Sequence, residues 1–254
     1  MMKHLLVLAV TLVSFSVSTP RAIGGCRYDS QCKGDQICKK GVCVSPASKE
    51  APAATLAPDD KHWITDQRTK CRVWNQHPQP NELILWFGVC KNGLAEGYGA
   101  VEWFVDGKSY EVDQGDWHDG KMHGPGVMTF ANGNRYEGDF REGKENGHGV
   151  LTKADGDRYE GDFREGKATG HGVMTFADGD QYDGDFRDNK RTGHGVLTKA
   201  DGDRFEGDFR DDKPTGHGVL TRADGDRFDG EWDEGCFRDG NGIAAIGRKA
   251  SSCP

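Results

Sequence analysis

Short stretches in the second half of the chain alternate between apolar and polar residues with the period of two that is typical of β-strands. In Tyr136-Glu-Gly-Asp-Phe140 the two aromatic side chains fall on one face, and the two acidic side chains face the other way. Residues 141–146 form a connection, and a second alternating stretch covers residues 147–153. Asp155-Gly156 then gives a type I′ hairpin signal. The pattern predicts one antiparallel β-hairpin that leads directly into the next.

This hairpin unit recurs at a constant interval along the chain. Its first aromatic position is occupied in turn by Tyr136, Tyr159, Tyr182, Phe205 and Phe228. A fixed period of this kind, here about 23 residues, is typical of a repeat architecture. Two less regular units precede it, starting at Trp86 and at Tyr110, and the second carries a small insertion near Val112. We therefore expect a repeat array over residues 86–235.

Glycine and aromatic residues recur in phase within the units. Glycines leave room for neighbouring rings to lie across the strands, and each contact between rings is worth about 0.5–1.5 kcal/mol beyond burial. The rings predicted to form this ladder, and to offer a packing or interaction face, are Tyr136, Phe140, Tyr159, Phe163, Tyr182, Phe186, Phe205 and Phe209. The expected fold class is all-β: an elongated, single-layer antiparallel sheet of tandem hairpins of about 23 residues.

The repeated text resembles a known family. Tyr136-Glu-Gly-Asp-Phe140, followed by Gly-Lys, Gly-His-Gly and Asp-Gly, is similar to the MORN repeat (membrane occupation and recognition nexus), whose pattern is YxGxxxxGxxxGxG. The resemblance covers roughly residues 86–232. Asn189 and Asp212 stand where a turn glycine is expected, and both residue types tolerate left-handed backbone. The resemblance implies a single-layer sheet that acts as a scaffold for protein assembly or membrane attachment.

Residues 1–22 are typical of a secretory signal peptide, with a basic start and an apolar stretch too short to span a membrane. We therefore expect a secreted or otherwise extracytoplasmic protein. An alternative is lipoprotein anchoring at Cys26, because Ile23-Gly24-Gly25-Cys26 loosely resembles a lipobox.

Eight cysteines behind such a segment indicate disulfides. They are Cys26, Cys32, Cys38, Cys43, Cys71, Cys90, Cys236 and Cys253. The first four define a small disulfide-rich module over residues 23–44, whose spacing resembles the Dickkopf amino-terminal region. An Ala/Pro-rich linker (45–62) and a segment that leads into the array (63–85) follow, and a tail (236–254) closes the chain. We expect Cys71 to pair with Cys90, and Cys236 with Cys253, as staples at the two ends.

The negative net charge limits the classes of partner that the protein is expected to bind. The formal net charge is −8, and the four regular repeats carry an acidic excess of 2, 3, 0 and 2, a net −7. Phosphate-rich nucleic acid needs a basic surface, so it is not an expected partner, and the same reasoning disfavours anionic membrane. An unknown protein partner or a second copy of the chain fits this surface better.

Two residue rows could suggest metal ions. Equivalent histidines of adjacent repeats (His148, His171, His194 and His217) should lie about 9–10 Å apart, too far to share zinc. The Asp-Gly-Asp turns offer two carboxylates each, fewer than the six to eight oxygens of a calcium site. They contain Asp155, Asp157, Asp178, Asp180, Asp201, Asp203, Asp224 and Asp226. We expect no metal, no cofactor and no catalytic residues, since no nucleophile, phosphate-loop or metalloprotease motif occurs.

A non-catalytic exported scaffold for protein–protein interaction is the function that this reasoning favours. The contact would use the apolar face, enriched by Met128, Phe130, Met174 and Phe176, or a terminal edge strand. The alternatives are a lipid- or cell-surface-binding module and a purely structural spacer.

Overall fold

The computed structural model of the protein describes residues 37–39, 42–44, 61–237, 244–247 and 249–253. The expected signal peptide, the linker and most of the four-cysteine module lie outside the described residues. Strands β1 (Ile37–Lys39) and β2 (Val42–Val44) form a two-stranded antiparallel sheet in which Cys38 stands opposite Cys43. Within the described part of the chain no helix is both long and apolar enough to span a membrane.

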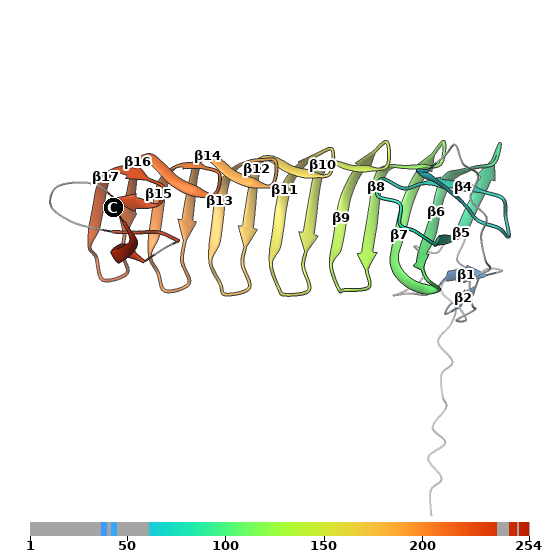
Figure 1. The fold of residues 1–254 in the computed structure, drawn as a ribbon, viewed down its shortest axis with the longest axis horizontal. Coiled ribbons are helices and arrows are strands. Elements are labelled where there is room, and N and C mark those ends of the chain that lie inside the picture. Colours follow the sequence, from blue (N-terminus) through green and yellow to red (C-terminus); the bar gives the residue numbers. More distant parts are fainter. Residues whose placement is uncertain (1–36, 40–41, 45–60, 238–243, 248, 254) are drawn as a thin grey trace, which may run out of the picture.

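Sixteen strands, from β3 to β18, form one continuous sheet (Figure 1). Its first six strands are β3 (Trp63–Thr65), β4 (Arg72–Trp74), β5 (Glu82–Lys91), β6 (Leu94–Val105), β7 (Lys108–His118) and β8 (Lys121–Phe130). The regular part consists of β9 (Arg135–Arg141), β10 (Lys144–Thr152), β11 (Arg158–Arg164), β12 (Lys167–Thr175), β13 (Gln181–Arg187), β14 (Lys190–Thr198), β15 (Arg204–Arg210) and β16 (Lys213–Thr221). Strands β17 (Arg227–Asp233) and β18 (Cys236–Phe237) close it, followed by the 3-10 turn Ala250–Ser252.

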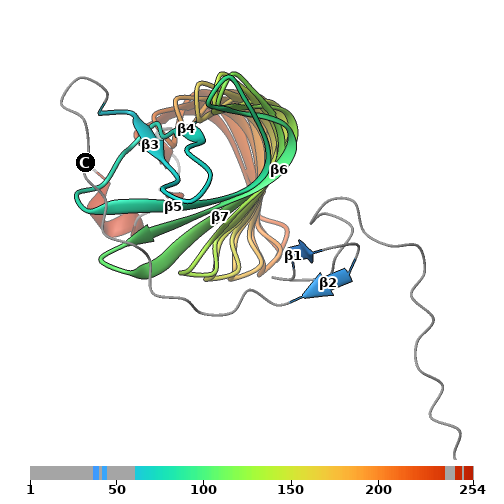
Figure 2. The same cartoon turned by 90° about the vertical axis from the view of Figure 1, so that its right-hand side faces the viewer.

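From β5 to β18 each strand pairs antiparallel with the next one in the sequence, which confirms the expected all-β chain of hairpins. A short parallel contact between β4 and β6 is the exception. Figure 2 looks along the array and shows the strands bent into arcs, so that the single layer forms a trough. The aromatic side chains lie inside this trough, which is how one sheet buries a face without a second layer.

Glycines make this curvature and ring packing possible. A Cβ atom added to Gly138 would lie 2.5 Å from the hydroxyl of Tyr136, and one added to Gly149 would lie 2.4 Å from it. Such distances are far below van der Waals contact. The Tyr136 ring therefore lies flat across two adjacent strands at positions where only glycine fits, as the sequence pattern predicted.

The turns differ from the expected ones. The type I′ turn is Glu142-Gly143, where φ is 54° and 77°, and it lets β10 begin at Lys144 instead of residue 147. At the opposite edge Asp155 has a negative φ and only Gly156 is left-handed, with φ of 103°. That loop is closed by the Lys153 N–H donating to the Asp157 carbonyl, so it is a type I turn followed by a glycine bulge and not type I′.

The boundary of the second irregular unit also needs correction. One full period counted back from Tyr136 reaches Asp113, and Gly115 pairs with Gly126 just as Gly138 pairs with Gly149. The unit is therefore in phase from Asp113 onward, and the expected insertion lies directly on the N-terminal side of Val112. The extra residues belong to the preceding hairpin, whose strands β6 and β7 are 12 and 11 residues long.

Both ends of the sheet are stapled. Cys71 is bonded to Cys90, and Cys236 to Cys253, so the two local pairings expected from the sequence are present. Strands β3 and β4 fold across the concave side at the start of the array (Figure 2). Trp74 packs there, since a Cβ atom on Gly143 would lie 2.5 Å from its ring. At the far end Phe237 covers Trp232, with ring centroids 5.3 Å apart.

Candidate functional site: a groove along the concave face

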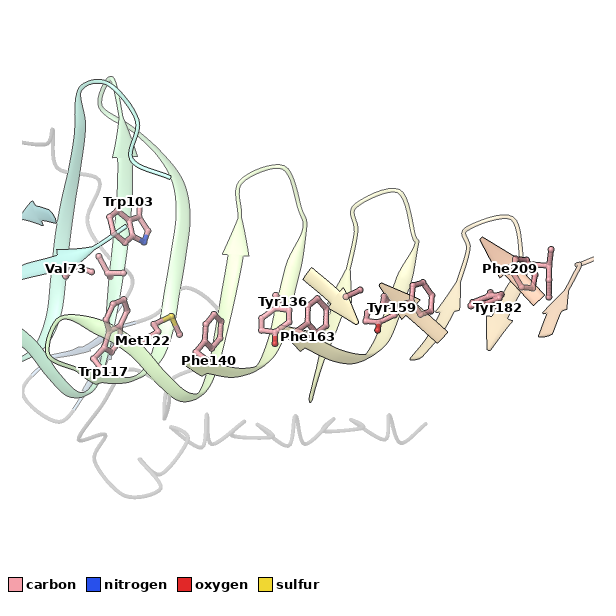
Figure 3. Close-up of a cluster of buried hydrophobic side chains, with 14 of the residues drawn as sticks. Val73, Trp103, Trp117, Met122, Tyr136, Phe140, Tyr159, Phe163, Tyr182 and Phe209 are labelled. Carbon is pink, nitrogen blue, oxygen red and sulfur yellow. The ribbon is translucent and has the colours of Figure 1, made fainter. Parts of the chain in front are cut away.

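The floor of the trough is a continuous zigzag of aromatic rings (Figure 3). Tyr136 meets Phe140 of its own repeat at 5.2 Å and Phe163 of the next repeat at 4.9 Å, both edge to face. The same two contacts recur in the following repeats as far as Phe205 and Trp232, at 5.0 Å. Edge-to-face geometry is the favourable arrangement for aromatic pairs. The ladder thus links neighbouring repeats along the whole regular array.

The rings themselves are buried in the trough. The eight predicted residues expose between 0% and 8% of their surface, because the curvature of the sheet closes over them. This burial agrees with a packing role, and Tyr136, Tyr159, Phe163 and Phe186 also line a cavity above the rings. What remains accessible is the layer above the rings, where Leu151, Met174 and Phe176 are only partly buried.

Two adjoining cavities of about 560 and 590 Å³ lie above the ring floor. The first extends from Tyr136 to Asp212, and the second from Phe176 to Gly247 in the C-terminal segment. Phe176, Arg191 and Asp212 line both cavities, so together they form one groove that follows the array. We call this feature the concave groove.

The repeat positions that face the groove are the variable ones. One such position, just after the type I′ turn, is occupied successively by Ala95, Met122, Glu145, Ala168, Arg191 and Pro214. Another, at the start of the glycine-bulge turn, is occupied by Phe130, Lys153, Phe176, Lys199 and Arg222. The ring and glycine positions hardly change between repeats. The scaffold is therefore constant, while the chemistry offered to the groove differs from repeat to repeat.

Charged side chains form the rims of the groove, and acidic residues outnumber basic residues by seven to four. Several are paired: Lys153 with Asp157 at 2.9 Å, Lys199 with Asp180, and Arg191 with Asp212 at 3.4 Å. The Arg191 guanidinium also lies 5.4 Å from the centre of the Tyr182 ring. The groove therefore combines an apolar floor with rims of net negative charge.

Four carboxyl side chains gather at the N-terminal end of the trough, on three different strands. We call Glu82, Glu111, Asp113 and Glu145 the acid cluster. Burial raises the pKa of each: Glu82 is 1% exposed and Asp113 is 4% exposed. The neighbouring negative charge of Asp113 raises the pKa of Glu111 further. The sequence analysis did not predict this cluster. It could have been found from Asp113, because this residue carries a carboxylate at the repeat position that Tyr136 occupies in the first regular repeat.

The histidine row lies on the convex face, where the side chains are 62–67% exposed. Each histidine stands beside a carboxylate of the next strand. His171, for example, lies 3.0 Å from Asp183, and His217 lies 3.2 Å from Asp229. The two cavities described above are not lined by any histidine of this row. The row is therefore a set of exposed surface histidines, each beside a carboxylate of the next strand.

The Asp-Gly-Asp residues have structural roles in the turns. Asp155 accepts the N–H of Asp157 at 3.1 Å, and Asp157 accepts the N–H of Ala177 in the next repeat at 3.1 Å. The first carboxylate therefore closes its own turn, and the second joins two repeats. In the described chain only Glu96, His118 and Asp119 bring three potential metal-ligating atoms within 4.8 Å of one another. That group is largely exposed, and its members already form ion pairs.

These features define a class: a repeat protein built as a curved single-layer β-sheet, with a constant ladder and a variable groove. The family model of the MORN repeat matches residues 114–135, 136–158, 159–181, 182–204 and 205–227. Residues 114–227 are thus five consecutive MORN repeats, and the sheet continues beyond them on both sides. MORN repeats are generally non-enzymatic modules that interact with proteins or lipids.

No curated protein matches the sequence. Among solved structures, one similar chain is the TCP domain of SAS-4 (dCPAP) of Drosophila melanogaster, solved in complex with a proline-rich motif of Ana2 (dSTIL). The two chains share 11% identity and a TM-score of 0.36, over 72% of this chain and 97% of that one. This level of likeness supports no conclusion about function.

Proposed function

We propose that the protein is a non-catalytic, exported scaffold that binds a protein partner in the concave groove. The observation that carries the proposal is the groove itself, with partly exposed apolar side chains above a fixed ring floor. Exposed apolar area of this kind on a protein surface marks a contact site. The variable positions that line it supply specificity, since constant positions could not discriminate between partners.

Export is the second part of the proposal. It rests on the disulfides at both ends of the sheet, which persist in oxidising compartments, together with the signal-like character of residues 1–22. Peptide mapping of the protein purified from its own cells, without reductant, should recover both pairings and a chain that lacks the first residues. A reduced, full-length protein confined to the cytosol contradicts this part.

Site-specific photo-cross-linking tests the groove. A photoreactive residue is placed at Leu151 or Met174, which line the groove, and, as a matched control, at Val150 or Val173 on the same strands. Adjacent residues of a strand point to opposite faces, so the control differs only in the side presented. We expect a defined protein adduct from the groove positions alone. Equal adducts from both faces, or adducts from the convex face only, contradict the proposal.

The same proteins separate the alternatives. Flotation with neutral and anionic liposomes, at low and high salt, tests the lipid-binding module, and light scattering of the purified chain tests assembly with a second copy. Liposome binding that Met174→Arg abolishes would assign the groove to lipid. A chain that shows no adduct, no flotation and only monomer is the structural spacer.

A further inference from the structure

The aromatic ladder is interrupted at one position inside the trough. Asp113 stands in phase with Tyr136, Tyr159 and Tyr182, so a carboxylate occupies the place that a ring fills in the regular repeats. Asp113 is 4% exposed. Its Oδ2 accepts the indole N–H of Trp103 at 2.6 Å. A buried charge in place of a ring costs stability, so this exchange calls for a compensating role.

Three further carboxyl groups face Asp113, and they come from different elements. Glu111 neighbours it on β7 and lowers the pKa of Asp113 through a side-chain hydrogen bond, whereas the charges of Glu145 on β10 and Glu82 on β5 raise that pKa. Tyr110 donates its hydroxyl hydrogen to Glu82, and Asn75 donates its side-chain N–H to Glu82 at 2.7 Å. These donors satisfy only one oxygen of Glu82.

Two buried oxygens in the acid cluster have no partner. They are Glu82 Oε2 and Asp113 Oδ1. Within the part of the chain that the structure describes, no lysine or arginine forms an ion pair with the four carboxylates, and His77 is the basic group that acts on Glu145. Buried acceptors are normally satisfied, and buried charges are normally paired. The cluster therefore lacks a cation with hydrogen-bond donors.

The spacing of the carboxylates favours an organic cation over a metal ion. No three ligating atoms of the acid cluster come within 4.8 Å of one another. A lysine ammonium carries three donors and an arginine guanidinium five, and each can bridge acceptors that are further apart. Met128 and Phe130 stand opposite Asp113 and Glu111 on β8. They offer an apolar flank for the stem of such a side chain.

The cluster adjoins the concave groove, because Glu145 and Tyr136 line its first cavity. We propose that the acid cluster binds a lysine or arginine side chain of the protein segment that occupies the groove. This inference rests on the proposed function and adds the chemistry of the partner. The net negative rims of the groove favour the same kind of segment, apolar with basic residues.

A library of random dodecapeptides, displayed and selected on the full-length oxidised protein, tests this proposal. Counter-selection on Met174→Arg, with Val173→Arg as its matched control, isolates the peptides that depend on the groove. We expect lysine or arginine to be enriched at one fixed position of these peptides. Replacing that residue by norleucine in a synthetic peptide should weaken binding about tenfold or more, as loss of a buried charged hydrogen bond does.

The double variant Glu111→Gln/Asp113→Asn keeps the shape of the cluster and removes two charges, and Glu145→Gln changes its accessible member alone. Both variants should abolish the preference for lysine over norleucine. The control Asp178→Asn/Asp203→Asn removes two charges elsewhere in the groove and keeps the turn acceptors. It should keep the preference. Since protons compete with the cation, affinity for the lysine peptide should rise between pH 5 and 8.

The outcomes separate the two proposals. Groove-dependent peptides without an enriched basic residue overturn the cation site and leave the groove as a protein-binding site. An equal loss of preference in the cluster variants and in the control also overturns the cation site. The preference for lysine would then come from the overall negative charge of the groove and not from the acid cluster. If no groove-dependent peptide is selected, both proposals fail.

Discussion

The regular repeats and the N-terminal end of the same sheet solve one packing problem in different ways. From Tyr136 onward the trough is filled by rings that touch edge to face, over glycines that admit no Cβ atom. At the N-terminal end it is filled by tryptophans, Met122 and the acid cluster, in which Glu82 and Asp113 are buried and Glu111 and Glu145 are partly buried. The first solution is repetitive and apolar. The second is irregular and leaves polar atoms without partners.

This difference indicates that the regular region contributes mainly to stability, whereas the N-terminal end is suited to recognition. In the regular region each ring contacts one ring of its own repeat and one ring of a neighbouring repeat, so removal of one ring loses two contacts, one of which joins the repeats. At the N-terminal end burial raises the pKa of the carboxyl groups, so their ionisation opposes folding at neutral pH, and Asn75, which follows β4, donates a hydrogen bond to Glu82 at 2.7 Å. A region that tolerates such a cost in a sheet otherwise optimised for packing is a candidate for binding.

The largest effect is expected from breaking the ladder. Tyr182→Ala removes a ring that is 0% exposed and that contacts Phe186 and Phe209. The free energy of unfolding should fall by about 3–5 kcal/mol, as for other buried aromatic residues replaced by alanine. Denaturant unfolding followed by far-ultraviolet circular dichroism measures it.

Tyr182→Phe is the matched control. It keeps the ring and removes only the hydroxyl, which donates to the Asp185 carbonyl at 3.2 Å. The chain itself carries phenylalanine at this position in the next repeat, at Phe205. We expect a loss of no more than about 1 kcal/mol. Equal losses in both variants would show that the hydroxyl bond, and not the contacts of the ring, accounts for the stabilising effect of Tyr182.

The second prediction concerns pH and has opposite signs in the two regions. The pKa values of Glu111 and Asp113 are raised, mainly by burial, so the folded state binds more protons than the unfolded state. Their penalty is absent below about pH 4, the ordinary pKa of a carboxyl, and grows as the pH rises. In the regular region the pKa values of Glu165 and Asp188 are lowered by Lys144 and Lys167. That weaker contribution is present at neutral pH and is lost as the pH falls.

Tryptophan fluorescence can follow the N-terminal end separately, because five of the six tryptophans precede the regular repeats. With the double variant Glu111→Gln/Asp113→Asn we expect a higher thermal midpoint than wild type at pH 8 and no difference at pH 4. Each 1 kcal/mol corresponds to about 2–4 °C in a domain of this size. A variant that is less stable at pH 8 would mean that the charges stabilise the fold, and the comparison would then be wrong.

The regular region could be predicted closely from the sequence because its rules are local. Alternation, the constant period and the glycine positions determine the strand pairing, and the left-handed Asn189 and Asp212 stand at the expected turn. The turn types could not be assigned in this way. Asp155-Gly156 suits a type I′ turn by composition, yet the second aspartate bonds to the next repeat and favours the glycine-bulge loop.

The groove and the acid cluster depend on curvature and on distant residues, which local patterns do not encode. The sequence predicted a single layer whose rings form a packing or interaction face, but not the bending of the strands that buries the rings almost completely (Figure 2). The aromatic pattern favours a unit that begins at Tyr110. With that starting point, Asp113 is not aligned with Tyr136 and its place in the ladder is not recognised. Counting one repeat period back from Tyr136 instead places the carboxylate of Asp113 at the ring position of the ladder.

The smallest effects are expected from the ion pairs along the type I′ turn edge, and they sharpen the comparison between the regions. Lys167 pairs with Asp188 at 3.0 Å, with both side chains more than half exposed. Solvent and salt screen such a pair, so Lys167→Met should not shift the thermal midpoint measurably.

Lys121 occupies the equivalent position at the N-terminal end, but it is 29% exposed and also lies 5.7 Å from the centre of the Trp74 ring. Lys121→Met should therefore lower the midpoint by about 1–4 °C, since a cation–π contact of about 0.5–1 kcal/mol is lost. Differential scanning calorimetry at low and high salt measures both variants, and equal shifts would show that Trp74 contributes nothing at this edge.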